Sequence, residues 1–434
     1  MIDRKHRLFV RKPERIGPPA RNSVAKWQLG NGLNVVASRM EGLKSVTLGI
    51  WVLTGSRCEE TATAGLTHFI EHTVFKGTKK RTSLGIARSL ESVGGNLNAF
   101  TSKEHTCYYA SVLSEHLDLA LDVLSDLVRS ASFESREVEK EKLVILEEIR
   151  DSEDNPEEYV QDLNYEQLFP SHPLGFPILG SPDTVMRITN RLVRDTYRRR
   201  YRPTNMVLSV AGGFEETELR HLTSKWFGRH AEGRRSSWHR QFKPPPTRSR
   251  KGSRKVVEKK ILQSHVSMGL RLPIHYRNSK KFDVLAYNLI LGGGMSSRLF
   301  QRIRERHGVA YSIYSFTDFL YDTGVLGVYL ATEKNKTEKA ERMVRAEILR
   351  LGERGALTSE LKMAKAQMTA NLLFGLESTS TQMIRIAKNE IYLKKSVDMS
   401  VLTDYINSIS LSDIRQIAEY VANHLHIVET SVIT

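Results

Sequence analysis

The order of apolar and polar positions indicates that the chain repeats one plan twice. Apolar and alternating runs predict an early strand in each half, at residues 46–54 and 265–273, and a late strand in each half, at residues 205–211 and 426–432. Long helical segments, a glycine-containing turn and a further strand lie between them in both halves. Because strands are grouped against helices, we expect an α+β fold built from two homologous α/β-layer halves.

A basic segment separates the two predicted halves. Residues 229–259 contain three successive prolines and no apolar periodicity, which is typical of an extended linker. We therefore expect a basic tail over residues 1–22, a first domain over residues 23–228, the linker, and a second homologous domain over residues 260–434. A chain of 434 residues agrees with two domains of about 200 residues each.

Charge and composition exclude several classes of protein. The formal net charge is +16, but residues 1–22 and 229–259 together account for +14 of it. The rest of the chain is nearly balanced, so a folded nucleic-acid-binding surface is not favoured. No run of 18 apolar residues predicts a membrane span, and two cysteines do not provide a disulfide framework. The first residues are rich in arginine, yet they lack the apolar run of a secretory signal.

The most informative motif lies in a short predicted helix over residues 64–75. His68 and His72 are four residues apart, so both imidazoles fall on one helix face and can bind the same metal ion. Glu71, one residue before the second histidine, can face that ion without being a ligand. This H-x-x-E-H pattern is the H-E-x-x-H signature of zinc hydrolases in reverse order.

A second helix, predicted over residues 137–154, can supply the third ligand. Glu141 and Glu148 are seven residues apart on one of its faces, two turns from each other. A glutamate from this helix, together with His68 and His72, would form the two-histidine, one-carboxylate set of a catalytic zinc site. The alternative is that these glutamates are solvated helix charges. The apolar stripe that we expect to bury this helix consists of Val138, Leu143, Val144, Leu146 and Ile149.

At this point the chain resembles the pitrilysin/insulinase-type zinc peptidases, or inverzincins. It is most similar to their two-domain branch, which includes the beta subunit of mitochondrial processing peptidase and its bacterial homologues. The family motif V-I-x-x-E-[IM] matches residues 144–149, which implies that Glu148 is the ligand and that Glu147 is its nearest competitor. The resemblance implies one zinc ion per chain, Glu71 as general base, and Glu141 as a support for a histidine ligand.

The segment after the metal helix offers a binding strand for a peptide. Two glycines followed by alternating residues at 94–102 predict a turn and an edge strand, and an edge strand can bind an extended peptide by strand addition. The resemblance implies that Asn98 and Ala99 lie beside the scissile bond. It also implies that Phe75 lines the pocket after the cleavage point. An ordinary hairpin and a core phenylalanine are the alternatives.

Two further pairs of residues are candidates for contact with substrate. Residues 291–311 contain three glycines but no phosphate-loop signature. They resemble the family segment whose arginine and tyrosine reach the active site from the opposite domain. In this chain the matching residues are Arg304 and Tyr311. The arginine would hold substrate carbonyls and the tyrosine would stabilise the oxyanion. Glu158 and Asp162 share one helix face and match positions that bind basic substrate residues, although acidic first turns also complement the helix dipole.

The sequence therefore predicts a zinc-dependent endopeptidase that hydrolyses peptides or unfolded presequence-like segments in a closed chamber. We expect a homodimer with a site in each protomer and no nucleic-acid partner. The expected location is the bacterial cytoplasm, with the mitochondrial matrix as the alternative. The rival functions are a non-catalytic core or assembly subunit of the same fold and, with less support, a basic nucleic-acid-binding protein.

Overall fold

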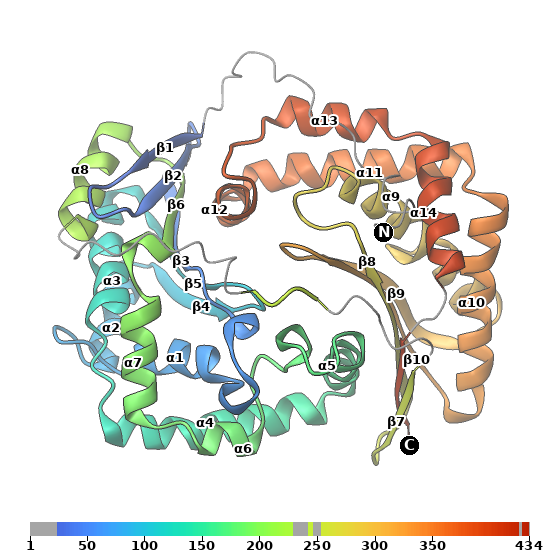
Figure 1. The fold of residues 1–434 in the computed structure, drawn as a ribbon. Helices are drawn as coiled ribbons and strands as arrows, with labels where there is room; N and C mark the ends of the chain where they lie inside the picture. Colours follow the sequence, from blue (N-terminus) through green and yellow to red (C-terminus); the bar gives the residue numbers. More distant parts are fainter. Residues whose placement is uncertain (1–23, 229–241, 246–252, 425–427, 434) are drawn as a thin grey trace, which may run out of the picture.

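The computed structural model describes residues 24–228, 242–245, 253–424 and 428–433. It contains two similar α/β halves that lie side by side (Figure 1). The predicted basic tail and most of the predicted linker fall outside the described residues. Within the described part of the chain, no helix is both long enough and apolar enough to cross a membrane.

The first half contains a six-stranded sheet with the strand order β1-β2-β6-β3-β5-β4. Its strands are β1 (Ala25–Gln28), β2 (Asn34–Arg39), β3 (Ser45–Val52), β4 (Asn96–Thr101), β5 (Thr106–Leu113) and β6 (Met206–Gly212). Strands β2 and β6 are parallel, and the other neighbours are antiparallel. The strand predicted after the two glycines is β4, and it lies at the edge of the sheet as expected.

The second half repeats this topology in a five-stranded sheet with the order β7-β11-β8-β10-β9. Its strands are β7 (Arg254–Glu258), β8 (Ser264–Leu272), β9 (Ala310–Phe319), β10 (Gly324–Thr332) and β11 (Val428–Ile433). The pair β7–β11 is parallel, as β2–β6 is in the first half, so each strand of the second sheet has a counterpart in the first and only β1 is additional. The two homologous halves are therefore confirmed.

One boundary differs from the sequence prediction. Arg254–Glu258, which we assigned to the linker, form β7 and pair with β11 in the second sheet. The strand has only five residues; Arg254, Val256 and Glu258 are exposed, so charged and apolar side chains share its outer face. Such a short segment carries too little apolar periodicity to be separated from a basic linker by pattern alone.

Helices cover both sheets. The first half contains α1 (Leu66–Val74), α2 (Ser83–Glu91), α3 (Leu117–Ser130), α4 (Ser135–Asp154), α5 (Pro156–Leu168), α6 (Pro182–Met186), α7 (Asn190–Arg200) and α8 (Glu216–Phe227). The second contains α9 (Lys281–Gly292), α10 (Thr337–Arg354), α11 (Thr358–Glu377), α12 (Thr379–Lys388), α13 (Met399–Ser408) and α14 (Leu411–Asn423), with π-helical turns over Phe300–Arg306 and Asn389–Leu393. Helix α9 follows β8 as α1 follows β3, but it contains no histidine.

The halves exchange one helix each across their junction, as Figure 1 shows for α5 and α12. From the first half, Val160 of α5 packs with Tyr329 in the second sheet. From the second half, Met383 and Ile386 of α12 pack with Trp51 in the first sheet. Apolar surface is therefore buried between the halves in both directions, and this fixes the position of α5, whose acidic residues reach the site described below.

Candidate metal centre

Helix α1 carries the histidine motif, and its start is fixed by two features. Gly65 precedes it with φ +91°, and a Cβ atom on this residue would lie 2.5 Å from the carbonyl oxygen of Leu179. The buried carboxylate of Glu59 accepts hydrogen bonds from the backbone N–H groups of Gly65 (2.8 Å) and Thr67 (2.6 Å). These contacts satisfy donors that the first helical turn leaves free. The helix spans Leu66–Val74, slightly shorter than the prediction.

His68 and His72 point toward one residue of α4. The Nε2 atom of His68 lies 3.7 Å from Oε1 of Glu148, and Nε2 of His72 lies 3.4 Å from Oε2 of the same carboxylate. Candidate ligand atoms of these three residues all lie within 4.8 Å of one another, and they form the one such group in the described part of the chain. Glu147, the competitor, instead points to solvent and pairs with Arg150.

These three residues fit a zinc ion. Oε2 of Glu148 is buried and accepts no hydrogen bond, as expected for an atom that faces a cation. Burial, followed by the charge of His72, lowers the pKa of His68 to about 3, so this imidazole is neutral and its ring nitrogen can donate to a metal. Two imidazole nitrogens and one carboxylate form a donor set that suits catalytic zinc and leave a position for water.

Glu141 supports the second histidine from behind. Its buried carboxylate accepts a hydrogen bond from Nδ1 of His72 at 2.9 Å and pairs with Nζ of Lys76 at 2.7 Å. Burial by itself would lower the pKa of His72 and raise the pKa of Glu141. The hydrogen bond between them acts against burial, and the pKa of His72 is raised while that of Glu141 is lowered. Because Nδ1 carries the hydrogen, Nε2 is left free to face Glu148.

The apolar stripe predicted for α4 was partly wrong. Leu143 and Val144 are exposed, whereas Val138, Ile145 and Ile149 are buried in the first core. The difference arises because Glu141 and Glu148 must face α1, which turns the side of the helix that carries Leu143 and Val144 toward solvent. The pattern of apolar residues alone does not indicate which face of α4 is buried, because that face is itself partly charged.

Glu71 lies beside the three ligands. Its carboxylate is largely buried and accepts a hydrogen bond from Oγ1 of Thr101, on β4, at 2.5 Å. Burial raises the pKa of Glu71 above its usual value, which moves this carboxylate toward the range of a general base at neutral pH. Sequence reasoning identified Glu71 but gave no signal for Thr101.

A cavity of about 970 Å³ opens at this cluster. Asn98 and Ala99 of the edge strand β4 line it, as do Glu158 and Asp162 of α5. Phe75 is not among the lining residues of this cavity; it packs against the first core, with its ring 5.9 Å from that of Tyr108. The strand and the acidic residues are thus brought to the metal ligands, and Phe75 is not.

Arg304 and Tyr311 do not reach this cavity within the described chain. They lie next to each other in the second half, with the guanidinium 5.5 Å from the centre of the Tyr311 ring. Tyr311 is 72% exposed and Arg304 is exposed as well. A different residue of the second half, Tyr314, lines the cavity and donates a hydrogen bond to Glu157. No sequence signal distinguishes Tyr314 from the other tyrosines.

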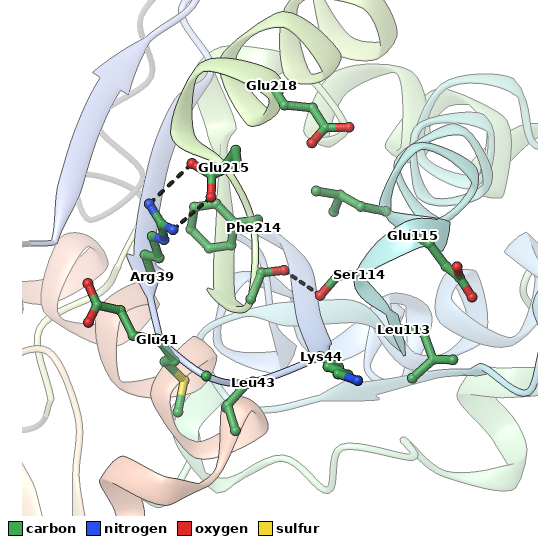
Figure 2. A pocket seen from close by; sticks show the side chains of 14 residues that line it. Arg39, Glu41, Leu43, Lys44, Leu113, Ser114, Glu115, Phe214, Glu215 and Glu218 are labelled. Carbon is green, nitrogen blue, oxygen red and sulfur yellow. Dashed lines mark hydrogen bonds and ion pairs between the residues drawn. The ribbon is translucent and has the colours of Figure 1, made fainter.

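A second hollow, of about 860 Å³, lies elsewhere on the first half (Figure 2). Its lining includes an exposed ion pair in which Arg39 donates to both carboxylate oxygens of Glu215. The lining contains neither histidine nor cysteine, and the metal-ligand group found in the described chain lies in the other cavity. The candidate chemistry is therefore confined to the cavity beside α1.

The comparisons with known proteins agree with this geometry. A family model described as insulinase (peptidase family M16) matches residues 34–182, and a model described as peptidase M16 inactive domain matches residues 187–368. YmxG of Bacillus subtilis, described as an uncharacterized zinc protease, is 36% identical over 396 residues, which span 91% of this chain and 95% of YmxG.

Solved structures show the same fold. A protease from Helicobacter pylori has a TM-score of 0.89 at 22% identity and covers 95% of this chain and 100% of its own. A chain of Complex III2 from Candida albicans has a TM-score of 0.81 at 18% identity and covers 94% of this chain and 96% of its own. Because one of these proteins is described as a protease and the other as a chain of Complex III2, the fold by itself does not decide function.

Proposed function

Because the chain belongs to the insulinase (M16) family of peptidases, we propose that it is a zinc-dependent endopeptidase. The observation that carries this proposal is the approach of the two imidazole Nε2 atoms to Glu148, with Glu71 beside them in the same cavity. Its relatives named zinc proteases, such as YmxG, support the choice of metal.

Different residues of the cavity have different roles in the proposed reaction. His68, His72 and Glu148 would hold the ion, which when bound polarises the scissile carbonyl and lowers the pKa of a water molecule. Glu71 takes a proton from the attacking water as its oxygen bonds to the carbonyl carbon. Glu71 then returns the proton to the amine nitrogen as the C–N bond breaks. Thr101 holds the Glu71 carboxylate through its hydrogen bond.

The lining of the cavity supports a basic, extended substrate. The exposed edge of β4 offers backbone groups to a peptide by strand addition, next to Asn98 and Ala99. Six carboxylates and neither lysine nor arginine are among the lining residues. This charge favours peptides or unfolded presequence-like segments that carry arginine or lysine.

We also propose that the active form is a homodimer. Arg304 and Tyr311 are exposed and lie outside the cavity, so a second copy can reach them without unfolding either half. Sedimentation equilibrium should give about twice the chain mass of 49.4 kDa. A monomer with full activity would contradict this proposal and leave the peptidase proposal intact.

The decisive experiment is hydrolysis of a quenched peptide library by the wild type, by Glu71→Gln and by chelator-treated protein. We expect both treatments to abolish cleavage, whereas Glu71→Gln should retain the zinc content of the wild type when measured by mass spectrometry. The rival function, a non-catalytic assembly subunit, would give no cleavage by the wild type. The presence of all four motif residues argues against that rival, because a subunit without activity has no need of Glu71.

A further inference from the structure

Tyr314 is the residue through which the second half contributes to the cavity. Among the described lining residues, it is the only one that comes from beyond Leu179. Its ring lies 5.0 Å from that of Tyr329, the residue opposite it on β10, and the hydroxyl of Tyr329 is 2.8 Å from Nδ1 of His265. The second sheet therefore holds the Tyr314 side chain in one position.

The hydroxyl of Tyr314 donates a hydrogen bond of 2.6 Å to Oε1 of Glu157. Glu157 belongs to the first turn of α5, the helix that the first half extends over the second sheet. Hydrogen bonds to an ionised carboxylate are short and strong, so this contact orients the carboxylate without neutralising its charge. Burial and this hydrogen bond both raise the pKa of Tyr314, so the phenol keeps its proton.

The three acids of α5 that line the cavity differ in their environments. Burial raises the pKa of Asp162, and the charge of nearby Lys103 opposes this rise, so the charge of Asp162 is partly balanced. Glu158 is exposed, where water weakens its attraction for a cation. Glu157 is half-buried and held by two neutral donors, the hydroxyls of Tyr314 and Tyr329, and it forms no ion pair within the described chain.

We propose that Glu157 receives a basic side chain of the bound peptide and that Tyr314 is the positioning residue that aims it. This inference rests on the proposed function and names the specificity of the same site. It assigns the leading role to Glu157 rather than to Glu158 and Asp162. Tyr314 donates to Oε1, and the hydroxyl of Tyr329 also forms a hydrogen bond with Glu157, but a carboxylate offers about four lone pairs, so it can still accept from an arginine or lysine of the substrate. The subsite then depends on contact between the two halves.

The test compares paired peptides that differ only by arginine or its neutral isostere citrulline, placed in turn at each position around the cleaved bond. At the position that occupies this subsite, the wild type should prefer arginine. Tyr314→Phe should reduce the arginine-to-citrulline ratio of kcat/KM by a factor on the order of ten. Glu157→Gln should reduce it at least as much, and the double variant should be no worse than Glu157→Gln alone.

The chain offers a matched control. Tyr165 donates a hydrogen bond of 2.8 Å to Asp318 across the same two halves but does not line the cavity. Tyr165→Phe therefore removes an equivalent tyrosine–carboxylate contact and should leave the arginine preference unchanged. An equal loss of preference in Tyr165→Phe would overturn the proposal, as would an equal loss of activity on both peptides in Tyr314→Phe.

A binding measurement separates this inference from the proposed function. Fluorescence anisotropy with Glu71→Gln protein measures whether the arginine peptide binds more tightly than the citrulline peptide, and it needs no turnover. Adding Tyr314→Phe to this variant should remove most of the difference. If the wild type cleaves nothing while this preference is present, the proposed function fails and the subsite stands. If cleavage occurs and the preference is absent, the subsite proposal is wrong.

Discussion

Replacing Arg57 with methionine should destabilise the protein strongly, because this residue neutralises a buried acid at the junction of the halves. One guanidinium nitrogen lies 2.6 Å from Glu104 and the other lies 2.7 Å from Asp322, on the turn between β9 and β10. The side chains of Arg57 and Glu104 are 0% and 1% exposed, whereas that of Asp322 is 26% exposed.

The magnitude follows from this burial. Breaking a buried ion pair from one side costs about 3–5 kcal/mol, because the remaining charge is left without its partner. Glu104 keeps hydrogen bonds from the Tyr392 hydroxyl and the Tyr321 backbone N–H, so we expect a loss of about 3 kcal/mol, at the lower end of this range. Asp322 is partly solvated and should add little.

The loss should depend on pH. Burial raises the pKa of Glu104 above 4.5, and loss of the Arg57 charge should raise it further. Between the pKa of Glu104 in the unfolded chain and its higher pKa in the folded chain, the unfolded chain binds fewer protons. The stability of the variant therefore falls as pH rises through this range. The difference between Arg57→Met and wild type should therefore be larger at pH 8 than at pH 5.

Urea unfolding followed by circular dichroism at both pH values measures this difference. Arg39→Met is the matched control, because the pair of Arg39 with Glu215 is exposed, at 51% and 63%. That variant should lose no more than about 1 kcal/mol. If Arg57→Met loses no more than this control, or loses more at pH 5 than at pH 8, the account of the junction is refuted.

Three further predictions concern the metal helix and its support. Glu141→Gln should weaken zinc affinity about 10–100-fold by loosening His72, measured by competition with a chelator; Glu139→Gln, an exposed change on the same helix, should have no effect. Burial raises the pKa of Glu59 from 4.5 to about 7, so unfolding measurements should show stability that falls as pH rises through this window, and Glu59→Gln should remove that slope. Gly65→Ala should lower the midpoint of thermal unfolding, because the new Cβ meets a carbonyl oxygen at 2.5 Å and the φ of +91° is strained; an unchanged midpoint would show that the start of α1 tolerates a side chain here.

Parts of the fold that depend on local pattern were predicted well. The strands β3, β6 and β8 lie within one or two residues of the predicted runs, because each is long and mostly buried. The short strand β7 was assigned to the linker, because three of its five residues are charged and its two valines are adjacent, so no alternating pattern marks it as a strand. The exchange of α5 and α12 between the halves had no sequence signal, because the apolar residues of a helix do not indicate which of two sheets will bury them.

In the site, too, local features were predictable from the sequence and contacts between elements were not. The spacing of His68, Glu71 and His72 determined that they share one helical side, since this requires only the 3.6-residue period of the backbone. Helical periodicity left Glu141 and Glu148 open as partners, and the family motif added Glu147 as a competitor. The resemblance to the family, and then the packing of α4 on α1, selected Glu148 as the facing carboxylate and Glu141 as the support.

What the sequence determined by itself is the local chemistry: a helix with two histidines and a glutamate, an acidic helix after it, and an edge strand between them. What only the tertiary structure decided is which side chains meet across elements, such as Tyr314 with Glu157, and which remain apart, such as Arg304 from the metal cavity. The physical reason is that spacing along one helix is set by covalent geometry. Contact between distant segments is set instead by the packing of whole surfaces, which no local pattern encodes.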